Sequence, residues 1–393
     1  MDYNPFSPEV KANPYPYYAH LRRSAPVYQV EAAGFWAVSR YDDVLYVLRN
    51  PQLFSSSVLI AALLGDLNPV PEAANLIASD PPVHTRLRKL VNRAFTPRLI
   101  AALEPRLREI TIELLNRVAP QGEFDLVRDL STPLPVIVIA EMLGVEPEHR
   151  ADFKRWSDDI VHAANGVSGE ERERAQQSVA EFRAYFQDVI EARRVAPKND
   201  LITALVRAEE EEQMLTSGEV LSLTTLLLIA GNETTTNLIG NAVLALLEHP
   251  EALQQVQAGP LLIPHVVEET LRYDSPVQGI FRQATQDVEL AGTTIPAGTL
   301  VFPLFASADR DERKFPDPDR FDITRNTDGH IAFGFGIHFC LGAPLARLEA
   351  KVALEELLAR FTRLSRTDEQ VTRVDSFFLR GPKTLPLTFK VVA

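Results

Sequence analysis

The strongest constraint on the fold comes from residues 220–247, an almost continuous apolar stretch with helical spacing. About 20 apolar residues are enough for a helix to cross a membrane. Glu233, however, lies at the middle of the stretch, and polar side chains flank it from Asn232 to Asn237. An ionisable residue in this position indicates a long buried helix with a polar interruption rather than a membrane span.

Helical periodicity continues through most of the chain, whereas strand-like segments are short. Helices are predicted over residues 97–118, 133–143, 175–194, 218–247, 264–273 and 341–361. Strands are predicted over residues 27–30, 35–38, 288–290, 300–303 and 385–392, near turns at residues 291–292 and 296–298. No linker, internal repeat or low-complexity tract interrupts the chain, so we expect one domain over residues 1–393.

The charge balance excludes some classes of partner. Lysine and arginine number 40 against 53 aspartates and glutamates, a net charge of -13 that disfavours binding to nucleic acid or an anionic membrane. Residues 1–8 have neither a basic start nor an apolar run, so we expect no signal peptide and no membrane anchor. The single cysteine fits a reducing compartment, and we expect a cytoplasmic protein.

That single cysteine, Cys340, is either inert or a lone reactive thiolate, because a disulfide or a four-cysteine metal site needs partners. Buried, inert cysteines are the commoner case. Here the predicted helix over residues 341–361 places Cys340 at a helix N-terminus, which stabilises a thiolate and lowers the pKa of the thiol. Gly342 would let a flat group approach the chain closely, which suggests haem iron facing the sulfur.

A cysteine protease would use the thiolate differently, with a histidine base that faces the sulfur. His338 is two residues from Cys340 in chain expected to be extended, so its side chain is expected on the opposite face. This position disfavours the protease hypothesis.

The ten residues from Phe333 to Gly342 read Phe-Gly-Phe-Gly-Ile-His-Phe-Cys-Leu-Gly. This pattern resembles the haem-binding loop of the cytochrome P450 family, the haem-thiolate monooxygenases. The resemblance implies a mainly α fold with a small β-rich side, built as one domain around a buried haem b. It also implies that Cys340 is the axial ligand of the iron, with Phe333, Gly334 and Gly342 shaping the haem-binding loop.

A second motif lies in the polar interruption of the long helix, where residues 230–235 read Ala-Gly-Asn-Glu-Thr-Thr. It resembles the oxygen-activation motif of the same family. The Thr234 hydroxyl can bond back to the Ala230 carbonyl and open the helix beside Gly231, leaving room for dioxygen. Glu233 and Thr234 would then relay the protons that reduction of dioxygen consumes. A kinked helix with a solvated glutamate is the alternative interpretation.

Glu269 and Arg272 stand three residues apart on one predicted helix face. Taken alone, such a pair is most often an exposed one that contributes little to stability. In the resembled family this Glu-x-x-Arg pair is buried and joined by an arginine from a later proline-rich segment. Arg320, within residues 315–321, is predicted to be that third member, in a network that supports the Cys340 loop.

The two propionates of haem need cationic or hydrogen-bonding partners. The resemblance assigns this role to four residues: His84, Arg88, Arg282 and His338. His84 and Arg88 are one turn apart on a predicted helix face.

Residues 81–103 contain no acidic residue and five cationic ones: Arg86, Arg88, Lys89, Arg93 and Arg98. An ordinary solvated helix would explain this composition. Monooxygenation, however, requires two electrons, and the chain is too short to include a flavin reductase. We therefore expect a separate acidic carrier of the ferredoxin type to dock on this basic face.

The predicted substrate pocket is largely apolar. Residues 58–78, including Leu63 and Leu64, resemble the variable lid of the family, and residues 165–169 could form the hinge of a mobile cover. The other predicted pocket residues are Ala230, Val277, Gly279, Ile280, Phe377 and Phe378. Such a pocket fits a medium or large hydrophobic molecule such as a macrolide, terpenoid, steroid or fatty acyl compound.

Together the motifs predict a monooxygenase that inserts one atom of dioxygen into an apolar substrate. Two alternatives remain open, namely a peroxide-driven peroxygenase on the same scaffold and a noncatalytic haem sensor or carrier. The Glu233–Thr234 pair disfavours both, because neither function needs a proton relay for dioxygen.

Overall fold

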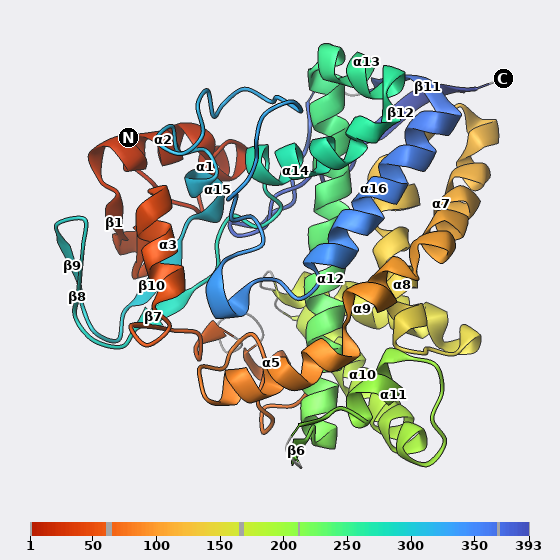
Figure 1. The fold of residues 1–393 in the computed structure, drawn as a ribbon, viewed down its shortest axis with the longest axis horizontal. Coiled ribbons are helices and arrows are strands. Elements are labelled where there is room, and N and C mark those ends of the chain that lie inside the picture. The colour runs from red at the N-terminus through yellow and green to blue at the C-terminus, as the bar shows by residue number, and fades with distance from the viewer. Residues whose placement is uncertain (1, 60–64, 165–168, 211–212, 368–369, 393) are drawn as a thin grey trace. The chain divides into compact units, whose positions relative to one another are not determined.

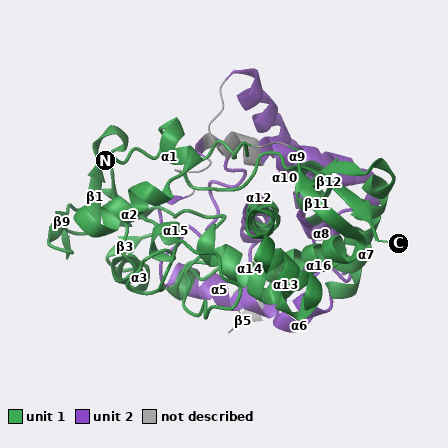
Figure 2. Cartoon of the chain, turned by 90° about the horizontal axis from the view of Figure 1, so that it is seen from above, with its two compact units in different colours: residues 1–55, 104–134, 234–393 green, residues 56–103, 135–233 purple. Residues whose placement is uncertain are grey.

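The computed structural model describes residues 2–59, 65–164, 169–210, 213–367 and 370–392 (Figure 1). The chain divides into two compact units, each assembled from separate stretches of sequence (Figure 2). Unit 1 comprises residues 1–55, 104–134 and 234–393, and unit 2 comprises residues 56–103 and 135–233. The boundary at residues 233–234 falls within one helix, α12 (Ser217–Glu248), which therefore contributes to both units.

The helices of unit 1 that matter most for the site are α14 (Ile263–Tyr273) and α16 (Ala343–Arg360). α16 packs against α14 and against α7 (Glu104–Val118), with Leu345, Val352 and Leu357 among its buried residues (Figure 1). The shorter helices are α1 (Pro8–Ala12), α2 (Tyr15–Ser24), α3 (Tyr41–Arg49), α13 (Pro250–Ala258) and α15 (Phe305–Ala308).

The main sheet of unit 1 has the strand order β1–β2–β10–β7–β3. Its strands are β1 (Val27–Val30), β2 (Phe35–Val38), β10 (Leu300–Pro303), β7 (Arg282–Ala284) and β3 (Phe54–Ser55). β2 and β10 are parallel, with Leu300 opposite Phe35, and the other neighbouring pairs are antiparallel. The inward side chains of these strands pack with those of α3 and α15 into the core of this unit.

Two smaller β structures complete unit 1. The strands β11 (Phe361–Arg366), β12 (Pro386–Val391) and β4 (Glu123–Asp125) form an antiparallel sheet. The strands β8 (Val288–Leu290) and β9 (Thr293–Ile295) form a hairpin. The two residues that join them, Ala291 and Gly292, have φ of 50° and 78°, as a two-residue type I′ turn requires.

Unit 2 is mostly helical. Its helices are α5 (Val83–Ala94), α6 (Pro97–Ala101), α8 (Pro133–Met142, which begins in unit 1), α9 (Arg150–Ala164), α10 (Glu170–Val195) and α11 (Leu201–Val206). α10 packs against α9 and α11, and α11 against α5. Asp200 caps α11 through the Thr203 amide at 2.8 Å and pairs with Arg193 of α10 at 2.6 Å, which fixes the join between the two helices.

Short helical turns and one small hairpin connect these elements. The turns are Glu31–Ala33, Gly65–Leu67, Ala119–Gln121, Val127–Ser131, Pro147–His149, Pro260–Leu262 and Gly336–His338. The hairpin pairs β5 (Glu209–Glu210) with β6 (Gln213–Met214). Among the helices that the structure describes, none has both the length and the hydropathy that crossing a bilayer requires.

The mainly α fold with a small β-rich side is confirmed, and most predicted elements agree with the observed bounds to within a few residues. One helix prediction was wrong, because residues 97–118 form α6 and α7 rather than a single helix. Pro105 has no N–H to donate to the carbonyl of Ala101, so α6 cannot continue past that point. Pro105 instead lies in the first turn of α7, where the missing donor has no cost.

Candidate active site

The loop that carries Cys340 is closed by its own backbone. The Cys340 amide donates to the Phe333 carbonyl at 3.0 Å, and the Phe339 amide donates to the Gly336 carbonyl at 3.1 Å. Gly334 and Gly336 both have a φ of 71°, which favours glycine. A Cβ on Gly336 would also lie only 2.9 Å from the Leu48 carbonyl oxygen of α3, so this position has no room for a side chain.

Cys340 lies just before α16, as the sequence predicts, although the helix begins at Ala343 rather than Leu341. The Ala343 amide donates to the Cys340 carbonyl at 3.4 Å, and Pro344 occupies the first turn. The cysteine is partly exposed. Its Sγ would be 3.9 Å from a Cβ on Gly342, an ordinary van der Waals distance, so Gly342 lies directly beside the sulfur.

An ion pair fixes the start of the loop from outside it. Arg347 of α16 lies over the Phe333 ring at 4.5 Å and donates to Glu268 of α14 at 2.6 and 3.0 Å. His330 Nε2 lies 2.9 Å from the same carboxylate. Burial acts to raise the pKa of Glu268, but hydrogen bonds from His330 and Arg347 outweigh it and lower the pKa to about 2.

Glu269 and Arg272 form a bidentate pair at 2.7 and 2.8 Å, and both side chains have no solvent exposure. Arg272 also donates to the backbone oxygen of Asp309 at 3.0 Å, and the Asp309 carboxyl accepts the Ile331 amide at 2.7 Å. Ile331 in turn accepts the Gly334 amide at 2.8 Å. Hydrogen bonds thus connect the buried pair to the start of the Cys340 loop.

The prediction that Arg320 is the third member of this network is wrong. Its side chain is 72% exposed, and the acidic group it approaches among the described residues is Asp322, at 3.9 Å. The third arginine is Arg325, whose side chain is 11% exposed and donates to Glu269 at 3.1 Å. Arg320 contributes its backbone oxygen, which accepts from Arg272 at 3.2 Å and from Arg325 at 2.9 Å.

The predicted oxygen-activation motif lies near the middle of α12, which stays helical across it. A Cβ on Gly231 would meet no atom within 4 Å, so there is open space beside the helix at this residue. Burial raises the pKa of Glu233 to about 7. Asn232 donates to Ser157 of α9 at 2.5 Å, which fixes the helix next to Glu233.

The next residue of the motif has a buried carboxyl partner that the sequence analysis missed. Thr235, which is 2% exposed, hydrogen-bonds to Glu349 of α16. Burial raises the pKa of Glu349 to about 8, and the hydrogen bond from Thr235 opposes the shift only in part. The available signal was spacing, since Glu349 follows Leu345 by four residues on the buried face of α16.

The four predicted propionate partners are divided between the units. His84 is buried on α5 of unit 2, one turn before the partly buried Arg88. Arg282 of β7 and His338 belong to unit 1. Arg282 is 5% exposed, and its guanidinium donates to the Phe281 carbonyl at 2.8 Å.

The predicted substrate residues of unit 1 come together on two adjacent segments. Val277 pairs with Leu379 in a β-bridge, and the Gln278 amide donates to the Phe378 carbonyl at 2.8 Å. Val277 and Ile280 pack against the buried cluster that includes Leu48 of α3, and Phe377 and Phe378 pack against the buried cluster that includes Leu21 of α2.

The other predicted substrate positions differ in their surroundings. A Cβ on Gly279 would lie 2.5 Å from the Pro303 carbonyl oxygen, so this glycine allows close packing against β10. Ala230 is exposed on α12. Leu63, Leu64 and residues 165–168 of the proposed hinge lie outside the described residues.

Comparison with known proteins decides what this arrangement is. The cytochrome P450 family model matches residues 11–259 and 261–389. The chain belongs to the cytochrome P450 family. Its P450 relatives include CYP109Q5 from Chondromyces apiculatus, whose structure matches with a TM-score of 0.93 at 50% identity over 100% of this chain and 99% of the other.

Two further P450s are also similar over nearly their whole length. CYP109E1 from Bacillus megaterium, solved in complex with testosterone, matches with a TM-score of 0.88 at 41% identity over 96% of this chain and 99% of the other. The 6-deoxyerythronolide B hydroxylase of Saccharopolyspora erythraea is 41% identical over 386 residues, or 94% of each chain. The chain is a cytochrome P450 monooxygenase.

P450s bind haem b through a cysteine thiolate, and haem b is the cofactor of this enzyme. The residues present fit that group. The chain has one thiol, which stands at the N-terminus of α16 directly beside Gly342, a residue with no side chain. The structure also has open space beside Gly231, two residues from Glu233, whose pKa burial raises to about 7.

Proposed function

We propose that this P450 inserts one oxygen atom from dioxygen into a medium or large apolar substrate, by hydroxylation or epoxidation. A separate ferredoxin-type carrier supplies the electrons. The observation that carries the proposal is the sole thiol of the chain, placed at the start of α16 on a loop connected by hydrogen bonds to a fully buried Glu269–Arg272 pair.

Haem, when bound, supplies the binding and activation of dioxygen. Cys340 would ligate the haem iron through its thiolate, and Phe333, Gly334 and Gly342 would shape the loop around it. Four residues hold the propionates: His84, Arg88, Arg282 and His338. Glu233 and Thr234 hold and pass protons beside the open space at Gly231.

The apolar substrate class is supported by the side chains on the two adjacent segments. Val277, Ile280, Phe377 and Phe378 are hydrophobic and only partly buried, so they can still cover a ligand. A relative at 41% identity was solved with the steroid testosterone, a molecule of this class. The substrate's orientation over these side chains would decide which carbon reacts.

Dependence on oxidant tests the function directly. The purified enzyme, supplied with an apolar substrate, should form product with dioxygen and a reduced ferredoxin. Product formed with peroxide alone would indicate a peroxygenase, and a protein that binds haem but gives no product under either condition would indicate a sensor or carrier.

Replacing Glu233 should remove a titration near neutral pH. With a pKa of about 7, its carboxyl carries a proton below that pH and can donate it, so wild-type turnover should fall as pH rises through about 7. Glu233→Gln cannot transfer a proton, so turnover should drop about 100-fold and lose this pH dependence. A pH profile of kcat that is unchanged in the variant would contradict the role.

Stability provides a second measurement for the same residue. The unfolded chain releases the Glu233 proton above about 4.5, whereas the folded protein keeps it up to about 7. The folded state therefore binds more protons between these values, and wild-type stability should decline as pH rises across this window. In thermal melts, the stability of Glu233→Gln should decline less than that of wild type across the same window.

The basic face of α5 and α6 is smaller than the sequence predicts. Arg86 pairs with the buried Glu219, so it contributes little net charge. Lys89, Arg93 and Arg98 are exposed and carry the proposed docking surface for the electron carrier. Because a long-range attraction between opposite charges speeds encounter, the surface should act mainly on the association rate.

Reversing two of these charges should therefore slow reduction by the carrier. For Arg93→Glu with Arg98→Glu, we expect about a tenfold lower reduction rate at low salt, a smaller difference at high salt and unchanged substrate affinity. Arg128→Glu, at an arginine that is 72% exposed in unit 1, is the control. Equal rates for the double variant and wild type at low salt would eliminate this face.

A further inference from the structure

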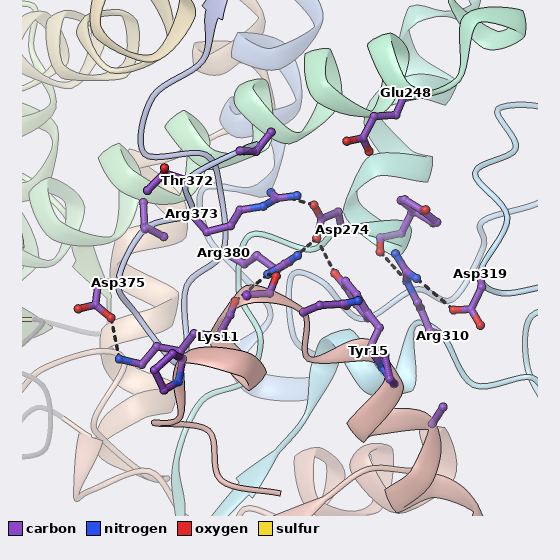
Figure 3. A pocket seen from close by; sticks show the side chains of 18 of the residues that line it. Lys11, Tyr15, Glu248, Asp274, Arg310, Asp319, Thr372, Arg373, Asp375 and Arg380 are labelled. Atoms are coloured by element: carbon purple, nitrogen blue, oxygen red, sulfur yellow. Dashed lines mark hydrogen bonds and ion pairs between the residues drawn. The ribbon is translucent and has the colours of Figure 1, made fainter. Parts of the chain in front are cut away.

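A cavity of about 880 Å³ lies in unit 1, between the N-terminal helices, the end of α14 and the loop before β12 (Figure 3). Its volume is in the range of small-molecule sites. None of the described residues assigned above to haem, oxygen, substrate or the electron carrier lines it. The cavity is therefore distinct from the sites assigned above.

Asp274, at the end of α14, is the charge at the centre of this cavity. It is 6% exposed, accepts from Tyr15 at 2.6 Å and from Arg380 at 2.8 Å, and pairs with Arg373 at 3.2 Å (Figure 3). Burial alone would raise the pKa of Asp274, but Arg373 and Arg380 outweigh it and hold the pKa well below its usual value. The carboxylate is thus ionised at any physiological pH.

Arg310 adds a third fixed guanidinium to the wall. Its Cζ lies 3.6 Å from the centre of the Tyr15 ring and 3.9 Å from that of Tyr273. Its Nε donates to the Tyr273 carbonyl at 2.7 Å, and its Nη1 to Asp319 at 3.0 Å. The Asp319 side chain is 70% exposed, so water weakens its compensation of the arginine.

The inner wall therefore has more positive than negative charge. Three guanidiniums face one buried carboxylate, Asp274, and the exposed Asp319. At the rim, Lys11 pairs with Asp375 and Arg366 with Glu248, which adds no net charge. Such a surplus on a protein with a net charge of -13 favours an anion in this cavity.

Arg373 presents donors of the right shape. Its contacts with Asn241, at 2.9 Å, and Asp274, at 3.2 Å, both use Nη1. Within the residues that the structure describes, its Nε and Nη2 have no hydrogen-bond partner, and the side chain is 16% exposed on the cavity wall. Two parallel N–H groups on one edge of a guanidinium match the two oxygens of a carboxylate or phosphate.

We propose that this cavity binds a small oxyanion, a carboxylate or a phosphate, on the Nε and Nη2 edge of Arg373. Arg310 and Arg380 supply additional positive potential, and both are held in place by the contacts described above. Apolar and aromatic surface, including that of Tyr15, Pro16 and Val371, surrounds the remainder of the ligand.

Occupation of the cavity should be coupled to the substrate side, a step that rests on the function proposed above. Arg373 stands at the base of a loop that is closed by the bond from the Val374 amide to the Gly381 carbonyl at 3.0 Å. The predicted substrate residues Phe377 and Phe378 stand at its tip. An anion that fixes Arg373 therefore restricts the same loop that positions these rings.

Calorimetric titration of the haem-loaded enzyme with succinate, benzoate and inorganic phosphate, each at matched ionic strength in sodium chloride, tests the site. We expect at least one of the three anions to bind. Binding of succinate or benzoate would indicate a carboxylate ligand, and binding of inorganic phosphate a phosphate ligand. Arg373→Ala should weaken it at least tenfold, as loss of a charge-assisted bidentate contact implies. Arg373→Lys, which keeps the charge without the two-donor edge, should weaken it as well.

Arg360→Ala is the matched control, since Arg360 is another partly exposed, paired arginine of unit 1 that does not line the cavity. Thermal melts monitored by circular dichroism verify that each variant folds. No binding of any of the three anions, or equal affinity in wild type and Arg373→Ala, would overturn the site.

The coupling has its own measurement. Substrate affinity, followed by the haem absorption change, should shift at least twofold when the bound anion is present, and should not shift in Arg373→Ala. An unchanged affinity in wild type would overturn the coupling. A failure of the proposed function would appear separately, as absence of product, and would leave the calorimetric result intact.

Discussion

Replacing Cys340 with alanine should abolish monooxygenation and the strongly red-shifted Soret band of the reduced enzyme with carbon monoxide. That band reports a thiolate on the iron, and Cys340 is the only cysteine in the chain. No other side chain can therefore restore the same ligation. The measurement is a difference spectrum of the reduced protein, with haem supplied during expression.

The control is the fold of the variant. The Cys340 side chain is small and partly exposed, so removing its sulfur takes little from the core. The circular dichroism spectrum of the variant should therefore stay close to that of wild type. Cys340→Ser tests ionisation, because a hydroxyl keeps the size of the side chain but does not become an anion at neutral pH. A red-shifted band that persists in either variant would show that the assigned ligand is wrong.

Removing Glu269 should have the largest effect on stability. Truncation to alanine leaves the guanidiniums of Arg272 and Arg325 without their carboxylate partner in a site where Arg272 has no solvent exposure. Breaking a buried pair in this way costs about 3 to 5 kcal/mol. We expect a lower free energy of unfolding in urea and a protein that no longer retains haem, whereas a stable, fully haem-loaded Glu269→Ala would refute the network's role.

The two candidate third arginines provide a matched comparison. Arg325→Ala removes a donor to Glu269 and to three backbone oxygens, so it should destabilise the fold by about 2 kcal/mol or more. Arg320→Ala keeps the backbone oxygen that the network uses and removes only an exposed side chain, so its effect should stay within about 0.5 kcal/mol. Equal losses would favour the original assignment of Arg320.

Sequence reasoning succeeded where a local pattern decides the structure. The bounds of α12 and α14 follow from helical spacing, and the turn at Ala291 and Gly292 follows from residue type. The sequence could place Cys340 before a helix because the glycines of its loop and the apolar spacing of α16 lie within about thirty consecutive residues. These features need no knowledge of which distant segments meet.

It failed where a contact depends on the path of an irregular segment. Arg320 lies within the proline-rich segment 315–321, whereas Arg325, which donates to Glu269, lies four residues beyond it. The backbone between Asp317, whose φ is 47°, and Arg325 is irregular, so spacing alone does not show which guanidinium reaches Glu269. The pairing of Arg347 with Glu268 likewise joins two helices that are far apart in sequence. No spacing rule connects such residues before the fold is known.

The contact between Thr235 and Glu349 connects α12 to α16, the helix that follows the Cys340 loop. α16 begins just after the loop that carries Cys340, and about two turns later its Glu349 hydrogen-bonds to Thr235, the residue next to Thr234. A shift of α16 along its axis would therefore move Cys340 and the Thr234–Thr235 segment of α12 together. A change in the position of the Cys340 loop would in this way also shift the segment of α12 that contains Thr234.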